Sequence, residues 1–234
     1  MQYKYCFMQN FEDFACGRVI IHRTGFSNYP VRLMQEVFFR CKQYLRGFEK
    51  FNIYDPCCGG AYILTVLGYL NFNSISALIG SDVNPEAVQL SQKNLSLLTI
   101  EGLQERIEHL QRLYSLYQKQ SHHDAINSAS NLRKYINSNE LQYHIFEHDI
   151  LNKPVKAAFK ADIVFSDVPY GNMVSWQSSK GEEINNLLEN IKPILHSESI
   201  IAISSDKSQK ITTDLKKLEK LLIGKRKIEI LKLY

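Results

Sequence analysis

The sequence lacks a long apolar run and a leader-like beginning. No stretch approaches the roughly 18 uncharged apolar residues of a membrane-spanning helix. The first residues, MQYKYCFMQNFEDF, show neither a basic region followed by an apolar one nor a small-residue cleavage site. With 234 residues, 44% of them hydrophobic, the chain can fill one large core. We therefore expect a globular, cytoplasmic protein with no membrane partner.

The spacings of a disulfide framework or a metal site are missing too. The cysteines are odd in number and contain no CxxC pair, so we expect reduced thiols. His122 and His123 are adjacent within a helical pattern and point in different directions, and no metal site is predicted. The cysteines are Cys6, Cys16, Cys41, Cys57 and Cys58.

What is present is an alternation of short strands and helices. Asn84 and Pro85 form a typical helix start, with the first as cap and the second in the first turn. Such alternation predicts a parallel sheet with helices on both faces, an α/β fold. Strands are predicted at 51–55, 76–82, 143–149, 161–169 and 199–206, and helices at 30–47, 62–70, 84–98, 181–195 and 212–222.

Two segments stand outside this alternation. Residues 100–140 carry apolar side chains at helical spacing and no strand, which predicts a helical insertion between the second and third strands. Residues 1–50 precede the first sheet strand and include the strand-like GRVIIH, a candidate for an appended layer. No internal repeat or linker marks a second domain, so we expect one domain, 1–234.

The net charge of +4 is unevenly distributed. Residues 18–50 hold seven basic and two acidic side chains, and residues 205–234 hold nine and four, whereas residues 51–204 hold eleven and sixteen. Basic flanks around an acidic middle suit a polyanionic partner, although solvated surface lysines would give the same count.

The turn after the first strand, DPCCGG, opens with a carboxylate. Neither GxGxxG nor GxxxxGK[ST] occurs in the chain, which argues against a nicotinamide enzyme and a P-loop protein. Asp55 at the mouth of this turn would repel a pyrophosphate. S-adenosylmethionine has no phosphate and carries an ammonium and a sulfonium, so it suits an acidic turn.

Two more carboxylates follow the next strands. Asp82 ends the second strand, where an acidic residue of a nucleoside-binding fold accepts hydrogen bonds from ribose, and Asp149 ends the third, where it can face adenine. Each alone could be a helix cap or a loop residue. Together with the glycine turn they predict a cofactor site at the carboxyl edge of the sheet.

The fourth strand ends in DVPY, which we interpret as the catalytic segment, Asp167, Val168, Pro169 and Tyr170. A carboxylate and a backbone carbonyl that accept from one amino group would hold a base amine in place, and the aromatic ring offers a stacking face. The same residues also make a good turn without any catalysis. No Pro-Cys pair occurs at this strand, so a cysteine nucleophile is discounted.

The chain resembles the AviRa family of 23S rRNA methyltransferases in several motifs. These are DPCCGGAYILTVLG, SDVNPEAVQLSQKNLSLL and DVPYG, with ACGRVIIH and YPVRL before them and GKRK near the C-terminus. Members of that family confer resistance to orthosomycin antibiotics. The resemblance implies a Rossmann-like, seven-stranded class I methyltransferase sheet with an N-terminal extension and an inserted helical hairpin. It further implies an S-adenosylmethionine-dependent enzyme that acts as a monomer on a guanine of 23S rRNA, naked or in an assembling subunit.

The resemblance also assigns residues. The catalytic positions are those of the DVPY segment, and the cofactor positions are Asp55, Pro56, Cys57, Cys58, Gly59, Asp82, Val83, Asp149 and Ile150. Two departures are visible. Ala61 stands where the usual GSG turn has its last glycine, which should be tolerated if φ there is negative, and Val168 replaces a first proline.

Other interpretations stay open. Trp176 could flank the base or simply pack, and Arg32 could contact cofactor or RNA or form a structural pair. Lys225, Arg226 and Lys227 are expected in a hairpin turn that could meet phosphate. The DVPY segment also suits an enzyme acting on adenine or on a protein glutamine. A non-catalytic RNA-binding module is the remaining alternative, but it would have lost the strand-end carboxylates.

Overall fold

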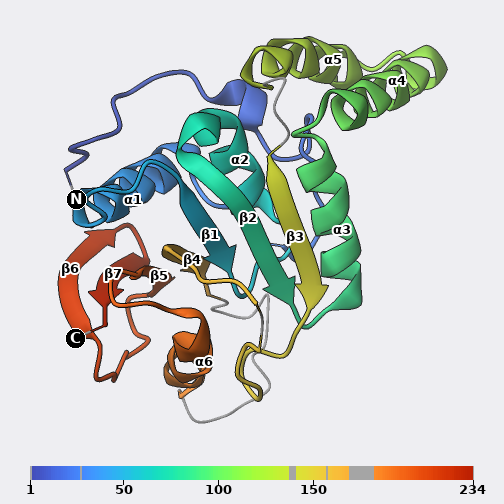
Figure 1. Ribbon diagram of the computed structural model, residues 1–234. Helices are drawn as coiled ribbons and strands as arrows, with labels where there is room; N and C mark the ends of the chain where they lie inside the picture. The colour runs from blue at the N-terminus through green and yellow to red at the C-terminus, as the bar shows by residue number, and fades with distance from the viewer. Residues whose placement is uncertain (1, 27, 137–140, 157, 169–181, 234) are drawn as a thin grey trace.

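The structure, a computed structural model, describes residues 2–26, 28–136, 141–156, 158–168 and 182–233. Its centre is a seven-stranded sheet in the order β3-β2-β1-β4-β5-β7-β6 (Figure 1). The first five strands in sequence are parallel, and β7 runs antiparallel to both β5 and β6. The strands are β1 (Phe51–Asp55), β2 (Ile75–Asp82), β3 (Gln142–Glu147), β4 (Ile163–Asp167), β5 (Ile200–Asp206), β6 (Lys216–Ile223) and β7 (Arg226–Lys232).

Apolar side chains alternate between the two faces of the central strands. In β1, Ile53 packs into one core cluster and Tyr54 into the other, and in β4 Phe165 and Val164 divide in the same way. All four are fully buried. This two-residue period on both faces is the pattern of a sheet covered on each side.

Helices from different parts of the chain cover the two faces. The first core cluster contains side chains of α1 to α5, and the second contains those of α6. In the view of Figure 1, α4 and α5 lie at the amino ends of the strands, away from the arrowheads of β1, β2 and β3. The predicted inserted hairpin is therefore confirmed. The helices are α1 (Val31–Tyr44), α2 (Tyr62–Asn71), α3 (Pro85–Ser96), α4 (Ile100–Tyr117), α5 (Gln120–Leu132) and α6 (Glu183–Ile191).

The strand-like segment GRVIIH does not form a strand. Val19 and Ile20 are fully buried, but the segment pairs with no strand of the described sheet. Its backbone is satisfied by side chains instead: Asn94 on α3 exchanges two hydrogen bonds with Ile21, and Arg106 on α4 donates to the carbonyl of Val19. Buried backbone groups need partners, and here two helices provide them.

The helix predicted over 212–222 is wrong as well, because these residues form most of β6. A register shift between Lys217 and Glu219 inserts an extra residue at Leu218. The bulge places Leu218 and Leu221, which are three positions apart, against the same core cluster. Their spacing therefore looked helical in the sequence, although the chain is extended.

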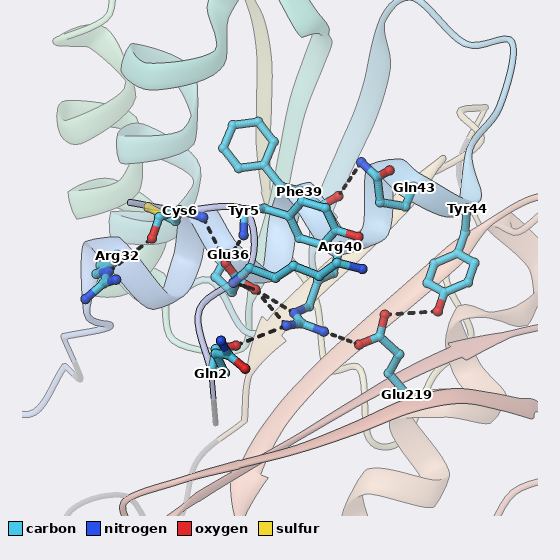
Figure 2. Close-up of polar contacts among 11 residues, drawn as sticks. Gln2, Tyr5, Cys6, Arg32, Glu36, Phe39, Arg40, Gln43, Tyr44 and Glu219 are labelled. Carbon is cyan, nitrogen blue, oxygen red and sulfur yellow. Dashed lines mark hydrogen bonds and ion pairs between the residues drawn. The ribbon is translucent and has the colours of Figure 1, made fainter. Parts of the chain in front are cut away.

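A buried carboxylate ties the N-terminal segment to α1 and β6 (Figure 2). Glu36 is fully buried and accepts hydrogen bonds from the backbone N–H groups of Lys4, Tyr5 and Cys6 at 2.8–2.9 Å. Arg40 also donates to Glu36, at 2.8 Å, and its guanidinium pairs with Glu219. Burial alone would raise the pKa of Glu36, but these hydrogen bonds lower it below its ordinary value.

Candidate active site

The carboxyl ends of β1, β2 and β4 bring three carboxylates to one edge of the sheet. Asp55, Asp82 and Asp167 are the last residues of these strands. The chain order reverses between β1 and β4, which is where open α/β sheets bind ligands. Ser166 Oγ donates to Asp55 Oδ1 at 2.9 Å and links the ends of β1 and β4 directly.

Asp55 is the most deeply buried of the three, with 2% of its surface exposed. Burial raises the pKa of Asp55 to about 7. The hydrogen bonds from the Cys57 N–H and Ser166 oppose this increase, while the neighbouring charges of Asp82 and Asp167 add to it. Near neutral pH this carboxyl therefore lies between its neutral and charged forms.

The glycine turn connects β1 to α2 and is held by β2. Cys58 donates its N–H to the Ser81 carbonyl at 3.0 Å, and Gly59 donates to Asp82 Oδ2 at 2.9 Å. The φ angle of Gly59 is +54°, a conformation that glycine adopts without a Cβ penalty. A Cβ added at Gly60 would lie 2.8 Å from Leu90 Cδ2 on α3, so glycine here permits close packing of the turn on that helix.

Ala61 does not meet the condition under which its methyl group was expected to be tolerated. Its φ is +54°, in the left-handed region rather than at negative φ, and the residue is fully buried. It precedes the first residue of α2, and its carbonyl accepts from Thr65 Oγ1 at 2.8 Å. Ala61, which stands in place of the last glycine of the turn, is therefore a position of backbone strain.

Asp82 and Val83 occupy the next strand end. Besides Gly59, Asp82 accepts from the Asn84 N–H at 2.9 Å, so its carboxylate shapes both the glycine turn and the start of α3. Burial raises the pKa of Asp82, and these backbone hydrogen bonds oppose the increase. Val83 leaves 62% of its surface exposed, unusually high for an apolar residue beside a buried turn.

Asp149 lies beyond the end of β3 and makes a turn with its own neighbours. Its Oδ1 accepts from the N–H groups of Leu151 and Asn152, and its Oδ2 accepts from the Asn152 amide at 2.8 Å. The Asn152 bonds lower the pKa of Asp149. Ile150 is buried in the second core cluster. The structure thus shows a turn-capping role for Asp149, and its expected role beside adenine stays a prediction.

The DVPY segment is only partly described. Asp167 is 8% exposed, and Val168 is fully buried with its N–H donating to the Ser204 carbonyl at 2.9 Å. Pro169 and Tyr170 lie outside the described residues, as does Trp176.

The two thiols of the turn are not activated. Burial, reinforced by Asp55, raises the pKa of both Cys57 and Cys58 well above the ordinary value, so they stay protonated at neutral pH. All five cysteines of the chain are free. The free thiols agree with the expectation of reduced cysteines, and the absence of a cysteine nucleophile at this turn stays a prediction.

Three neighbours of the site were missed or assigned otherwise. The ring of Phe26 lies 3.2 Å from where a Cβ of Gly59 would stand, and Tyr29 packs edge-on against Phe165 of β4. Arg226, expected to meet phosphate from a turn, is the first residue of β7 and reaches Asp167. No local pattern in the sequence relates these residues to the site.

Arg32 has a structural role. Its Nε donates to the Cys6 carbonyl at 3.1 Å, and its guanidinium lies 3.9 Å from the centre of the Tyr3 ring. Of the two interpretations left open for Arg32, these contacts support the structural one, since they hold the N-terminal segment on α1.

The site as a whole is acidic, and backbone N–H groups donate hydrogen bonds to its carboxylates. Among the described residues, no lysine, arginine or histidine forms an ion pair with Asp55, Asp82 or Asp149. Buried carboxylates normally have a cationic partner or become protonated. The arrangement is therefore suited to a ligand that carries positive charge.

Comparisons with known proteins agree with this chemistry. The family model described as "rRNA methyltransferase AviRa" matches residues 1–226. The chain belongs to this family. It is 34% identical over 222 residues to the 23S rRNA (guanine(2535)-N(1))-methyltransferase of Streptomyces viridochromogenes, covering 92% of this chain and 88% of that protein.

Solved structures of the AviRa enzyme from the same organism superpose closely. One, at 1.5 Å, has a TM-score of 0.87 and 32% identity over 96% of this chain and 93% of the AviRa chain. Another, at 2.4 Å, has a TM-score of 0.84 and 34% identity, with 94% and 91% coverage. TrmN from Thermus thermophilus, at 9% identity and a TM-score of 0.53 over 87% of this chain and 49% of its own, shares the fold alone. The predicted class I methyltransferase fold and the AviRa family are confirmed, and with them an rRNA methyltransferase activity.

Proposed function

We propose that this protein transfers a methyl group from S-adenosylmethionine to ring nitrogen N1 of a guanine in 23S rRNA. The observation that carries the proposal is the position of Asp167, at the end of β4 and linked through Ser166 to the acidic turn, in a chain 34% identical to a relative named for this reaction.

The residues of the acidic edge fit this cofactor. S-adenosylmethionine supplies an electrophilic methyl group on a sulfonium and also carries an ammonium. Asp55 provides buried negative charge, and the Gly59 turn lets backbone approach a ligand closely. Asp82 has further acceptor capacity for ribose hydroxyls, since each carboxylate oxygen accepts two hydrogen bonds. Pro56, Cys57, Cys58, Val83, Asp149 and Ile150 complete the proposed cofactor set.

The target nitrogen changes what Asp167 must do. The DVPY segment suits an exocyclic amine, whereas the relative is named for N1, a ring nitrogen that carries a proton in neutral guanine. That proton becomes more acidic as the N–C bond forms, and a carboxylate at hydrogen-bonding distance can accept it. Asp167 is proposed as this acceptor. Val168, fixed by its bond to Ser204, would orient the segment that holds the base, with Pro169 and Tyr170 following it.

The RNA is proposed to meet the basic flanks of the chain, which acts as a monomer in the cytoplasm. Exposed lysines gather on the C-terminal hairpin and the segment leading to it, whereas no helix among the described residues is long and apolar enough to cross a membrane. Phosphate contacts of this kind position RNA without reading its sequence. Methylation would protect ribosomes from orthosomycins. The exposed lysines are Lys207, Lys210, Lys216, Lys217, Lys220 and Lys225.

The test is transfer of labelled methyl from S-adenosylmethionine to unmodified 23S RNA, 16S RNA, large subunits and total protein, followed by nucleoside analysis. We expect label as 1-methylguanosine in 23S RNA. Label in methyladenosine or in protein would keep the fold and cofactor but refute the substrate. No transfer to any of these substrates would refute the activity.

Substitution of Asp167 tests the proton acceptor. Asp167→Asn should reduce transfer by about 100-fold or more, the usual contribution of a positioned acid or base, while the cofactor dissociation constant in calorimetry changes little. Asp206→Asn is the matched control, because this carboxylate ends the adjacent strand β5 and bonds only its neighbour Ser208 among the described side chains. Loss of cofactor binding in Asp167→Asn would assign the residue to the cofactor site instead.

A further inference from the structure

The C-terminal hairpin delivers a cation to the end of β4. Arg226 is the first residue of β7, and its Nη2 lies 3.5 Å from Asp167 Oδ2. Asp167 is 8% exposed, and the Arg226 side chain is 21% exposed. Opposite charges at this distance, largely shielded from water, interact more strongly than surface pairs.

The N-terminal segment also contacts the guanidinium. Arg226 Nη2 donates to the Asn28 carbonyl at 3.4 Å, and the guanidinium lies 5.2 Å from the centre of the Tyr29 ring. Tyr29 is 2% exposed and meets Phe165 of β4 edge-on, with ring centres 5.6 Å apart. Contact with a buried aromatic ring restricts the orientation of the planar Arg226 guanidinium, so its N–H groups keep one direction.

The charges around this pair are otherwise acidic. Asp55 interacts electrostatically with both Asp82 and Asp167, and each of these carboxylates makes the local potential more negative when it is ionised. From β5, Asp206 is opposite Arg226 in the strand register, but its carboxylate bonds Ser208. The next residue of β7, Lys227, pairs with Glu229 and donates to the Gln209 carbonyl. Arg226 is therefore the basic side chain that the described structure pairs with this carboxylate edge.

We propose that Arg226 is a positioning residue for Asp167, which it holds in the charged form and in one orientation for the reaction at guanine. This inference rests on the proposed role of Asp167. It replaces the expectation that Arg226 meets RNA phosphate from a turn. A phosphate-binding arginine presents its fork to solvent, whereas this one is directed at a carboxylate and covered by Asn28 and Tyr29.

The experiment compares Arg226→Gln, Arg226→Lys and Lys225→Gln with the unsubstituted enzyme. Lys225 is exposed in the same hairpin turn, so its substitution removes the same charge one residue away. Three quantities are measured on unmodified 23S RNA: kcat as a function of pH, RNA affinity by filter binding, and cofactor affinity by calorimetry.

We expect Arg226→Gln to move the acid limb of the kcat profile up by about 1 to 3 pH units, because an adjacent cation favours a carboxylate by that amount. On the acid side of the limb this lowers kcat by about tenfold or more at a given pH, while RNA and cofactor affinities change by less than about twofold. Asp55 and Asp82 share the same edge, so the limb belongs to the group of carboxylates and not to one residue. Lys225→Gln removes a charge that is proposed to meet RNA phosphate, so it should weaken RNA binding without moving the acid limb of the kcat profile.

Arg226→Lys keeps the charge without the planar fork, so kcat should fall by about threefold or more with RNA affinity intact. This variant decides the matter if Arg226→Gln does not fold. Weaker RNA binding with an unchanged acid limb in Arg226→Gln, or a fully active Arg226→Lys, would overturn the inference. An inactive unsubstituted enzyme would instead overturn the proposed function itself, so the two failures are distinguishable.

Discussion

Cofactor affinity should depend on pH through Asp55, because this buried carboxyl titrates in the neutral range. Burial raises its pKa to about 7, so it is mostly neutral at pH 6 and mostly charged at pH 8. A cationic cofactor binds the charged form better. The experiment therefore measures cofactor affinity as a function of pH, with Asp55→Asn as the uncharged reference. Asparagine retains an Oδ1 that can accept from Ser166 and from the Cys57 N–H, so the turn should keep its shape.

The size of the change in cofactor affinity follows from the fraction of Asp55 that is ionised. With a pKa near 7, about 3% of Asp55 is charged at pH 5.5 and about 75% at pH 7.5. If the bound cofactor requires the charged form, affinity rises by about 25-fold across this window, or about 1.9 kcal/mol. The window ends near pH 7.5 because an ordinary α-amino group, such as that of the cofactor, begins to lose its proton at about 7.7–8.0.

Stability of the protein without cofactor should show the opposite trend. A carboxyl whose folded pKa lies above its unfolded value stabilises the fold below the unfolded pKa of about 3.9, and this contribution is lost as pH rises through the folded pKa. The melting temperature without cofactor should therefore decline between pH 6 and 8 in the unsubstituted protein. In Asp55→Asn this decline should be absent, and cofactor should restore the melting temperature of the unsubstituted protein most strongly at the upper end.

Isothermal calorimetry measures both consequences. At pH 7, binding should release about half a proton per cofactor, seen as a dependence of the binding enthalpy on the buffer. The affinity of Asp55→Asn should be weak and nearly independent of pH. A flat affinity profile for the unsubstituted protein, or a full slope retained in Asp55→Asn, would show that Asp55 shapes the turn without binding the charge of the cofactor.

Two substitutions test the frame around the site by chemical denaturation at pH 7. Glu36→Gln should lower the free energy of unfolding by about 2–4 kcal/mol, because it weakens buried hydrogen bonds to three backbone groups and removes the charge that faces Arg40. Glu49→Gln, on the exposed surface, is the control. A loss below about 1 kcal/mol in Glu36→Gln would contradict this expectation. Ala61→Gly should raise the free energy of unfolding by about 1 kcal/mol, because glycine adopts the left-handed conformation of this residue without strain. A decrease would mean that the alanine methyl group contributes more through packing than it costs in backbone strain.

The central strands and the acidic edge could be predicted because their signals are local. Strands β1, β2 and β4 each contain a short apolar run, and Asp55, Asp82 and Asp167 are the residues that end these strands. Parallel strands place their carboxyl ends at one edge, so the meeting of the three carboxylates follows from the order of elements. The cap of α3 was equally local, with Asn84 accepting from the Glu86 N–H.

What could not be predicted depends on contacts between distant parts of the chain. The GRVIIH segment reads as a strand, but Asn94 and Arg106 satisfy its backbone from two helices. The bulge in β6 gives Leu218 and Leu221 a helical spacing. Ala61 appeared acceptable only under the assumption of negative φ, and the angle of a turn residue depends on how the whole turn packs.

Both ends of the chain converge on the end of β4. Arg40 of α1 joins Glu36, which holds the N-terminal segment, to Glu219 of β6 (Figure 2). Because β6 pairs with β7, this buried network also fixes the strand that begins with Arg226.

The N-terminal segment also contacts the site, because Asn28 and Tyr29 contact the Arg226 guanidinium. The N-terminal extension and the C-terminal hairpin thus both help to place the Arg226 guanidinium, which contacts Asp167. A sheet edge alone would place Asp167 among carboxylates that favour its protonation. The added elements supply the opposing charge, so we infer that they are part of the catalytic apparatus and not only a surface for RNA.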